Sequence, residues 1–160
     1  AHRSVKLRIL AVGHKMPAWI EAGYQEYARR MPPDALLELI EIKPEKRAAG
    51  ASTARIQKLE AERILAATPP QAMLVALDER GKQLSTVELS THIARWMQEG
   101  AQPCFVIGGA DGLDASVKSR SDLLLGISRL TLPHGLVRVL LAEQLYRAVS
   151  LLKGHPYHRE

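Results

Sequence analysis

Short apolar segments alternate with segments of helical periodicity along the whole chain, and this alternation restricts its fold more than any other feature. Several of the apolar segments contain no polar residue, which is typical of strands covered on both faces of a sheet. Strands separated by helices favour parallel pairing, because parallel neighbours need a crossover between them. We therefore predict an α/β fold with a doubly wound, mostly parallel sheet. The expected strands are 5–12, 36–42, 73–77 and 105–107, with one or two more within 123–132, and the expected helices are 17–30, 54–67, 85–98, 115–120 and 136–153.

Local signals mark the ends of one expected helix. Ser85 and Glu88 have the spacing of a capping box, in which each side chain bonds the backbone N–H of the other residue. Gly100 is where that helix should stop, because glycine accepts the left-handed backbone that closes many helices. The polar segment 78–84 before the helix is predicted to be a loop.

Length and composition suit one soluble domain. The chain has 160 residues, of which 46% are hydrophobic and 24% charged. No apolar run approaches the roughly 20 residues of a membrane span. The single cysteine, Cys104, lies in an apolar run and is expected to be a buried thiol in a reducing compartment. We expect one domain over residues 5–160 in the cytoplasm, and we interpret residues 1–4, which lack an initiator Met and match nothing in the strand that follows, as a remnant of protein expression.

The net charge of +5 favours polyanionic partners. The basic residues Lys43, Lys46 and Arg47 cluster in an expected loop, where they are either a solvated surface or an RNA contact. With a single Phe in the chain, an aromatic stacking platform for RNA is not expected.

The segment 136–153 is apolar on nearly all sides of a helix. Such a helix has to be covered from more than one direction. A second subunit would cover it, and so would a central position within one domain. Both explanations remain open at this point.

The glycine-rich segment Gly108–Gly112 directly follows an expected strand. It should therefore lie at the carboxyl edge of the sheet, where α/β folds bind ligands and where glycine lets the backbone approach a ligand closely. Neither GxGxxG nor GxxxxGK[ST] is present, so the segment is not a dinucleotide fingerprint or a P-loop. A simple turn is the alternative.

Other chemistries receive little support. His155, His158 and Glu160 lack the spacing of helical metal ligands, so we predict no metal site and a polar tail. No GxSxG elbow supports a serine nucleophile. His134, just before a helix, is expected to form hydrogen bonds in its first turn.

Three segments of the last third, Phe105–Leu113, Leu130–His134 and His155–Glu160, closely resemble the RlmH family. These are the ribosomal large-subunit pseudouridine N3-methyltransferases of the SPOUT superfamily. The resemblance runs from Val5 to Glu160. It also includes Leu10–Gly13 with Lys15, Tyr27–Arg30, Glu38–Ile42, Val137–Val139 and Glu143–Ala148.

The resemblance implies a C-terminal trefoil knot, an exception to the rule against threaded loops, and a homodimer. It also implies S-adenosylmethionine as cofactor, held by backbone groups of the knot. Transferred by motif, the cofactor pocket would comprise Leu77, Gly108, Gly109, Ile127, Ser128, Arg129, Leu130, Thr131, Leu132 and Pro133.

The implied methyl acceptor is N3 of a pseudouridine in 23S rRNA within assembled ribosomes. The tail residues Tyr157, His158 and Arg159 are then the catalytic candidates, with His158 as base or orienting group and Arg159 as charge stabiliser. Arg29, Arg30, Lys43, Lys46, Arg47 and Arg138 are candidates for RNA docking. The alternatives are a non-catalytic ribosome-binding or assembly factor of the same fold, and a knotted methyltransferase acting on tRNA or a small molecule.

Overall fold

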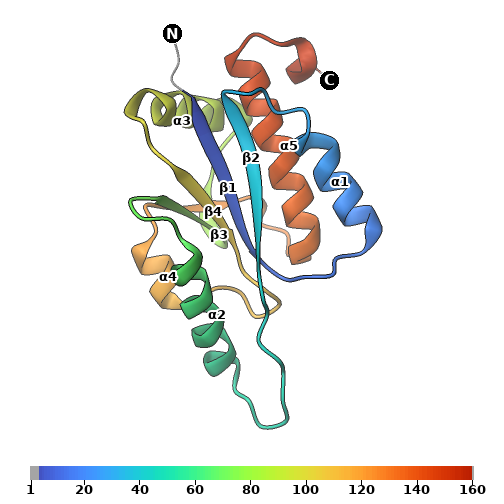
Figure 1. Ribbon diagram of the computed structural model, residues 1–160, viewed down its shortest axis with the longest axis vertical. Helices are drawn as coiled ribbons and strands as arrows, with labels where there is room; N and C mark the ends of the chain where they lie inside the picture. The colour runs from blue at the N-terminus through green and yellow to red at the C-terminus, as the bar shows by residue number, and fades with distance from the viewer. Residues whose placement is uncertain (1–3, 160) are drawn as a thin grey trace.

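The computed structural model describes residues 4–159, and the side chains of His158 and Arg159 lie outside that description. Five strands alternate with helices in the predicted order (Figure 1). The elements are β1 Val5–Val12, α1 Ala18–Ala28, β2 Ala35–Ile42, α2 Thr53–Ala67, β3 Met73–Gln83, α3 Thr86–Glu99, β4 Pro103–Ile107, α4 Ala115–Arg120, β5 Leu123–Gly126, α5 His134–Leu152 and the 3₁₀ helix η1 Pro156–Arg159.

The strands form one sheet in the order β2-β1-β4-β3-β5, and every neighbouring pair is parallel. The prediction of a parallel α/β sheet is therefore confirmed. Because all strands point the same way, their carboxyl ends share one edge, which is the lower edge in Figure 1.

Helices cover both faces of the sheet. Side chains alternate between the faces along each strand, so Leu7 and Ile9 of β1 join the core under α1, α3 and α5. Leu10 and Val12 join the second core, under α2 and α4. Cys104 lies fully buried in that second core, as expected of a structural thiol.

The local signals at α3 are confirmed. The Ser85 hydroxyl accepts a hydrogen bond from the Glu88 backbone N–H, and the Glu88 carboxylate accepts one from the Ser85 backbone N–H. Gly100 ends the helix with a left-handed φ of 68°.

The segment 78–84 is not simply the loop that was predicted. Strand β3 continues to Gln83, and its pairing with β5 shifts register, because both Leu77 and Lys82 pair with Leu125. The residues between them bulge out of the ladder. The prediction failed because bulged residues have the polar composition of a loop.

Helix α5 starts at the carboxyl edge of the sheet and ends near its amino edge (Figure 1). It packs against α1 and α3, and none of its residues is exposed. The chain itself therefore covers much of this apolar helix, while the second subunit and the trefoil knot remain predictions. No helix in the part of the chain that the structure describes has both the length and the apolar character needed to cross a membrane.

Candidate functional site

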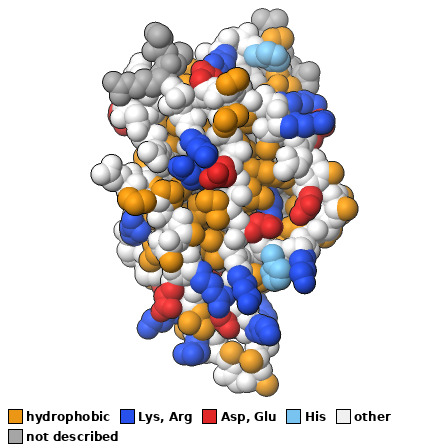
Figure 2. All heavy atoms as spheres, in the orientation of Figure 1, with side chains coloured by type: hydrophobic (Ala, Val, Ile, Leu, Met, Phe, Trp, Pro, Cys, Tyr) orange, Lys and Arg blue, Asp and Glu red, His pale blue; other side chains and the backbone are white. Residues whose placement is uncertain are grey.

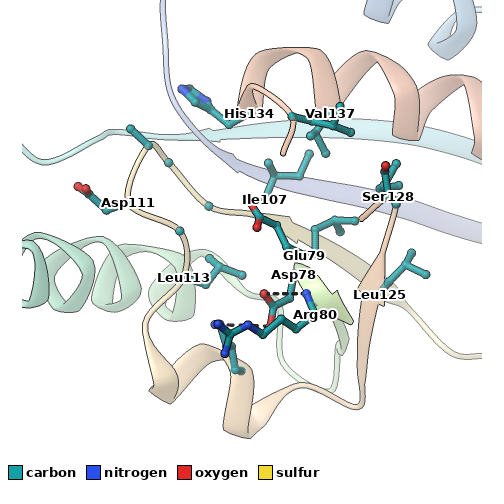
Figure 3. Close-up of a pocket in the computed structure, with 18 of the residues that line it drawn as sticks. Asp78, Glu79, Arg80, Ile107, Asp111, Leu113, Leu125, Ser128, His134 and Val137 are labelled. Atoms are coloured by element: carbon teal, nitrogen blue, oxygen red, sulfur yellow. Dashed lines mark hydrogen bonds and ion pairs between the residues drawn. The ribbon is translucent and has the colours of Figure 1, made fainter. Parts of the chain in front are cut away.

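A cavity of about 410 Å³ opens at the carboxyl edge of the sheet, beside the glycine segment. Its wall comes from the end of β3, the loop between β4 and α4, and the segment that joins β5 to α5 (Figure 3). It is lined by Gln57, Leu77, Asp78, Glu79, Arg80, Ile107, Gly108, Gly109, Ala110, Asp111, Gly112, Leu113, Lys118, Leu125, Ile127, Ser128, Leu130, Leu132, His134 and Val137.

Most of the expected cofactor residues lie together at this cavity. Those that line it are Leu77, Gly108, Gly109, Ile127, Ser128, Leu130 and Leu132. Arg129, Thr131 and Pro133 alternate in sequence with lining residues and are themselves exposed. The cavity thus joins segments that are about 50 residues apart in sequence, and the assignment of a cofactor to these residues stays a prediction.

The glycine segment is both a tight turn and a cavity wall. The backbone N–H of Gly112 donates to the Gly109 carbonyl at 3.0 Å, and Gly112 has a φ of 79°. A Cβ on Gly108 would lie 2.8 Å from the backbone carbon of Gly112. The two explanations offered by the sequence, a turn and a ligand wall, are therefore compatible.

One side of the cavity is polar, which the sequence analysis missed. Asp78, Glu79 and Arg80 come from the bulge of β3, and the Lys118 ammonium lies 3.5 Å from an Asp78 carboxylate oxygen. The available signal was a run of charged residues directly after the buried strand segment 73–77. A run of charged residues is typical of a surface loop, so the sequence alone does not assign it to a site.

A second polar contact ties the glycine segment to its neighbours. The Gln57 side-chain amide donates to the Asp111 carbonyl at 2.6 Å. The Arg47 guanidinium, on the loop after β2, donates to the Asp111 carboxylate at 2.6 Å. The basic loop is therefore attached directly to the cavity wall.

His134 lies at the start of α5 and is one of the lining residues, with its ring at the edge of the group drawn in Figure 3. Burial lowers the pKa of its imidazole, and the nearby Arg138 guanidinium lowers it further, against a smaller opposing effect of Glu60. The ring is therefore neutral near pH 7 and able both to donate and to accept a hydrogen bond.

The tail does not reach the cavity of its own chain. Helix α5 has 19 residues. At the usual rise per residue it is roughly 28 Å long, and it separates the cavity from the tail. The tail lies at the opposite edge of the sheet (Figure 1). Within one chain, therefore, the tail does not lie beside the glycine segment and the segment Leu130–His134. Of the catalytic candidates, the Tyr157 side chain is described and buried, while Glu160 and the side chains of His158 and Arg159 lie outside the described part.

The expected RNA-docking residues divide by burial. Arg138 is 2% exposed and cannot reach a phosphate, so that prediction is wrong. Lys43, Lys46 and Arg47 are exposed on the loop after β2. Figure 2 shows Lys and Arg side chains gathered over this loop and α2. Within residues 4–159, no group of three or more His, Cys, Asp and Glu side chains is placed to hold a metal ion.

Comparison with known proteins gives consistent matches over nearly the whole chain. The family model described as "Predicted SPOUT methyltransferase" matches residues 5–158. A ribosomal RNA large subunit methyltransferase H from Thiobacillus denitrificans is 62% identical over 98% of this chain and 100% of its own length. Proteins of the same name from Ralstonia pickettii and Burkholderia multivorans are 57% and 58% identical, each over 97% of this chain and 99% of their own length.

Among solved structures, the chain is similar to the SpoU methyltransferase AviRb from Streptomyces viridochromogenes. The TM-score is 0.47 and the sequence identity 12%, over 97% of this chain and 62% of that protein. A likeness of this degree adds nothing to the sequence matches.

Proposed function

Because the chain belongs to the SPOUT methyltransferases, and within them to the ribosomal RNA large subunit methyltransferase H family, we propose that it methylates N3 of a pseudouridine in 23S rRNA, with S-adenosylmethionine as methyl donor. The observation that carries the proposal is the glycine-walled cavity at the carboxyl edge, built by the segments that the family resemblance assigns to the cofactor.

The residues present suit this cofactor. A volume of about 410 Å³ lies within the range of small-molecule sites, and Leu77, Leu125 and Leu132 offer apolar surface for an adenine ring. The charged groups that line the same cavity, Arg80 and Asp78 among them, suit the carboxylate and ammonium of the methionine part. When bound, the cofactor supplies an electrophilic methyl group on a sulfonium.

The protein's own residues have to align the acceptor nitrogen and remove its proton. Proximity and alignment account for a large part of such catalysis. The neutral imidazole of His134 can hold a hydrogen bond at the cavity. We assign proton removal to His158 and stabilisation of the anionic base to Arg159, both from the tail of a second subunit, because one chain keeps its tail and its cavity at opposite ends. The functional unit is therefore a homodimer.

Docking onto the ribosome uses the exposed cations of the loop after β2, beside the cavity. Because Arg47 of this loop donates a hydrogen bond to Asp111 of the cavity wall, the basic loop lies beside the proposed acceptor site. A ribosomal substrate also implies a cytoplasmic location for the protein.

The decisive experiment uses ribosomes from a strain that lacks the corresponding enzyme. Purified protein and S-adenosylmethionine are added, and the 23S rRNA is mapped by mass spectrometry. We expect one new methyl group on one pseudouridine. Methylation of tRNA alone would overturn the proposed substrate, and S-adenosylmethionine binding without any methylation would favour an assembly factor.

The composite site has its own test in a mixed dimer. One subunit lacks residues 155–160, and the other carries Leu132→Trp to fill its cavity. We expect about half of the wild-type activity, because the intact cavity still receives the intact tail. Complete loss of activity, with dimerisation preserved, would show that each tail serves its own chain.

A further inference from the structure

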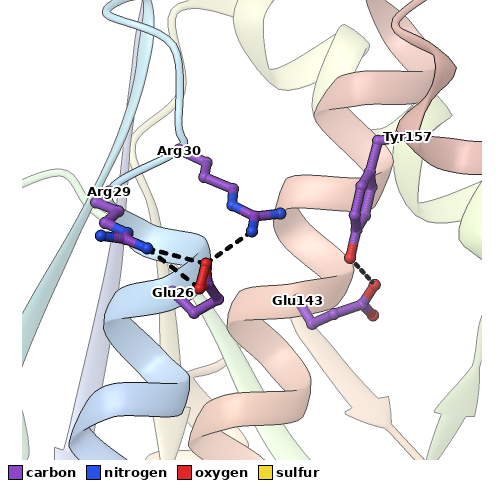
Figure 4. Close-up of polar contacts among 5 residues, drawn as sticks. All are labelled: Glu26, Arg29, Arg30, Glu143 and Tyr157. Atoms are coloured by element: carbon purple, nitrogen blue, oxygen red, sulfur yellow. Dashed lines mark hydrogen bonds and ion pairs between the residues drawn. The ribbon is translucent and has the colours of Figure 1, made fainter.

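The Tyr157 side chain, in the tail helix η1, is held by α5 of its own chain. Its hydroxyl donates to the Glu143 carboxylate at 3.0 Å (Figure 4). The same carboxylate oxygen accepts from Arg147 at 2.8 and 2.7 Å, and the Arg147 guanidinium lies 4.8 Å from the centre of the Tyr157 ring. The phenol is thus engaged through both its hydroxyl and its ring face.

A layer of rings and cations lies beneath Tyr157. The rings of Tyr146 and Tyr157 are 4.6 Å apart between centroids. Arg30, two residues after the end of α1, lies 5.9 Å from the centre of the Tyr146 ring and 2.7 Å from Glu26 of α1. The tail is therefore docked on α5, whose Tyr146 in turn contacts Tyr27 of α1 and Arg30.

The backbone also directs the tail back onto α5. Gly154 takes a left-handed φ of 72°, and the His155 backbone N–H donates to the Ser150 carbonyl at 2.8 Å. The Tyr157 backbone N–H then donates to the His155 ring at 3.2 Å. This turn directs η1 back toward α5.

We propose that Tyr157 is a positioning residue, which acts through Glu143 to fix where the backbone of His158 and Arg159 begins. The inference rests on the proposed function. It changes the role of Tyr157, which the sequence predicted to be catalytic, to that of a residue that positions the catalytic ones. A hydroxyl already committed to its own subunit's carboxylate is poorly placed to exchange protons with a base in another subunit's cavity. Burial, and then Glu143, also raise the pKa of the Tyr157 phenol far above neutral pH.

The test compares Tyr157→Phe, Tyr157→Ala and Glu143→Ala with a deletion of residues 155–160. Tyr157→Phe keeps the stacked ring, so we expect kcat on ribosomes to fall about 10-fold, with the KM for S-adenosylmethionine and the shape of the pH profile unchanged. Tyr157→Ala should lose about 100-fold, the scale of a misplaced catalytic group. Because the two residues act as one unit, Glu143→Ala combined with Tyr157→Phe should be little worse than the poorer single variant.

A chemical role for the hydroxyl would give different results. Tyr157→Phe would then be as inactive as the tail deletion, or would remove one limb of the pH profile, and either result would overturn the proposal. Full activity of Glu143→Ala would overturn it as well. The control is Tyr24→Phe, which removes the buried hydroxyl of a different tyrosine, in α1. This variant should keep wild-type activity.

A measurement that does not depend on methyltransferase activity separates this inference from the proposed function. Hydrogen exchange of the amides of residues 157–159 should accelerate in Tyr157→Ala and Glu143→Ala while the melting temperature changes little. Unchanged exchange would contradict the anchor. If the wild-type protein methylates no ribosomal RNA, the proposed function fails, yet the exchange experiment still decides whether the anchor exists.

Discussion

At the scale of the residue, Arg138 is the largest fully buried side chain among the described residues. Its Nη1 donates to the Glu41 carboxylate at 2.7 Å, across a sequence separation of 97. A buried cation is costly unless it is paired, so Glu41 determines whether Arg138 can lie under α1 and β2. Arg138 also lowers the pKa of His134, so this pair affects the cavity.

Replacing Glu41 by Gln should therefore destabilise the protein. The Arg138 charge would stay buried without its counter-ion, and we expect a loss of about 1–3 kcal/mol in the free energy of unfolding, reduced because Glu41 is partly exposed. Denaturant unfolding measures the change. Glu62→Gln, an exposed substitution on α2, is the control and should stay within about 0.5 kcal/mol of wild type.

The two histidines with lowered pKa predict how stability depends on pH. Burial is the main cause for both His92 and His134, and it disfavours their charged forms in the folded state. Below the ordinary pKa of 6.5 the unfolded chain binds protons that the folded chain resists, so stability should fall as the pH drops from 7 to 5.

Urea unfolding at several pH values checks this prediction. The double variant His92→Gln, His134→Gln should show a smaller loss between pH 7 and 5. An equal loss in the variant would refute the assignment, because carboxyl groups with lowered pKa, such as Glu38, act only below that range.

At the scale of the element, the bulge of β3 joins the sheet to the cavity. A Cβ on Gly81 would lie 2.6 Å from the backbone carbon of Leu125 and 2.7 Å from the nitrogen of Gly126. Backbone meets backbone there, so no side chain can move aside. The same bulge supplies Asp78 and Arg80 to the cavity, which makes its position decisive for the site.

Gly81→Ala should therefore displace β5 and weaken S-adenosylmethionine binding. We expect a loss of about 2–4 kcal/mol in stability, the range of overpacking and strain. Gly50→Ala is the matched control, because Gly50 has a positive φ but open space around it, and it should lose only about 1 kcal/mol from backbone strain. Calorimetry and denaturant unfolding measure both effects, and equal losses in the two variants would exclude the steric explanation.

At the scale of the whole molecule, the described structure keeps its functional parts at opposite ends. The cavity and the basic loop lie at the carboxyl edge of the sheet, and the docked tail lies near the amino edge (Figure 1). Helix α5 connects the two ends rigidly. A second subunit is the simplest means of bringing a tail to a cavity.

The basic loop predicts a salt-dependent association with ribosomes. Lys43→Ala with Lys46→Ala should weaken binding and reduce the slope of log affinity against log salt by about 1 to 2, because fewer counterions are released. Filter binding at several salt concentrations measures the slope. Arg95→Ala removes an equally exposed cation from α3 and should leave the slope unchanged, whereas equal slopes for all proteins would exclude this loop as the docking surface.

The sequence by itself determined the features that depend on near neighbours. Apolar runs and helical spacing set the order of strands and helices. The Ser85 and Gly100 signals set the ends of α3, and a glycine segment after a strand located the edge at which the cavity opens. Each of these follows from residues within a few positions of one another. The family motifs, which are also short local segments, contain most of the residues that line the cavity.

Only the tertiary structure decided the features made by distant pairs. The bulge of β3 depends on β5, the burial of Arg138 on Glu41, and the position of Tyr157 on its contacts with α5. Polar side chains such as these look solvent-exposed in a sequence, because nothing local reveals the partner that neutralises or stacks on them. The separation of tail and cavity also required the fold, since it depends on the direction in which α5 crosses the sheet.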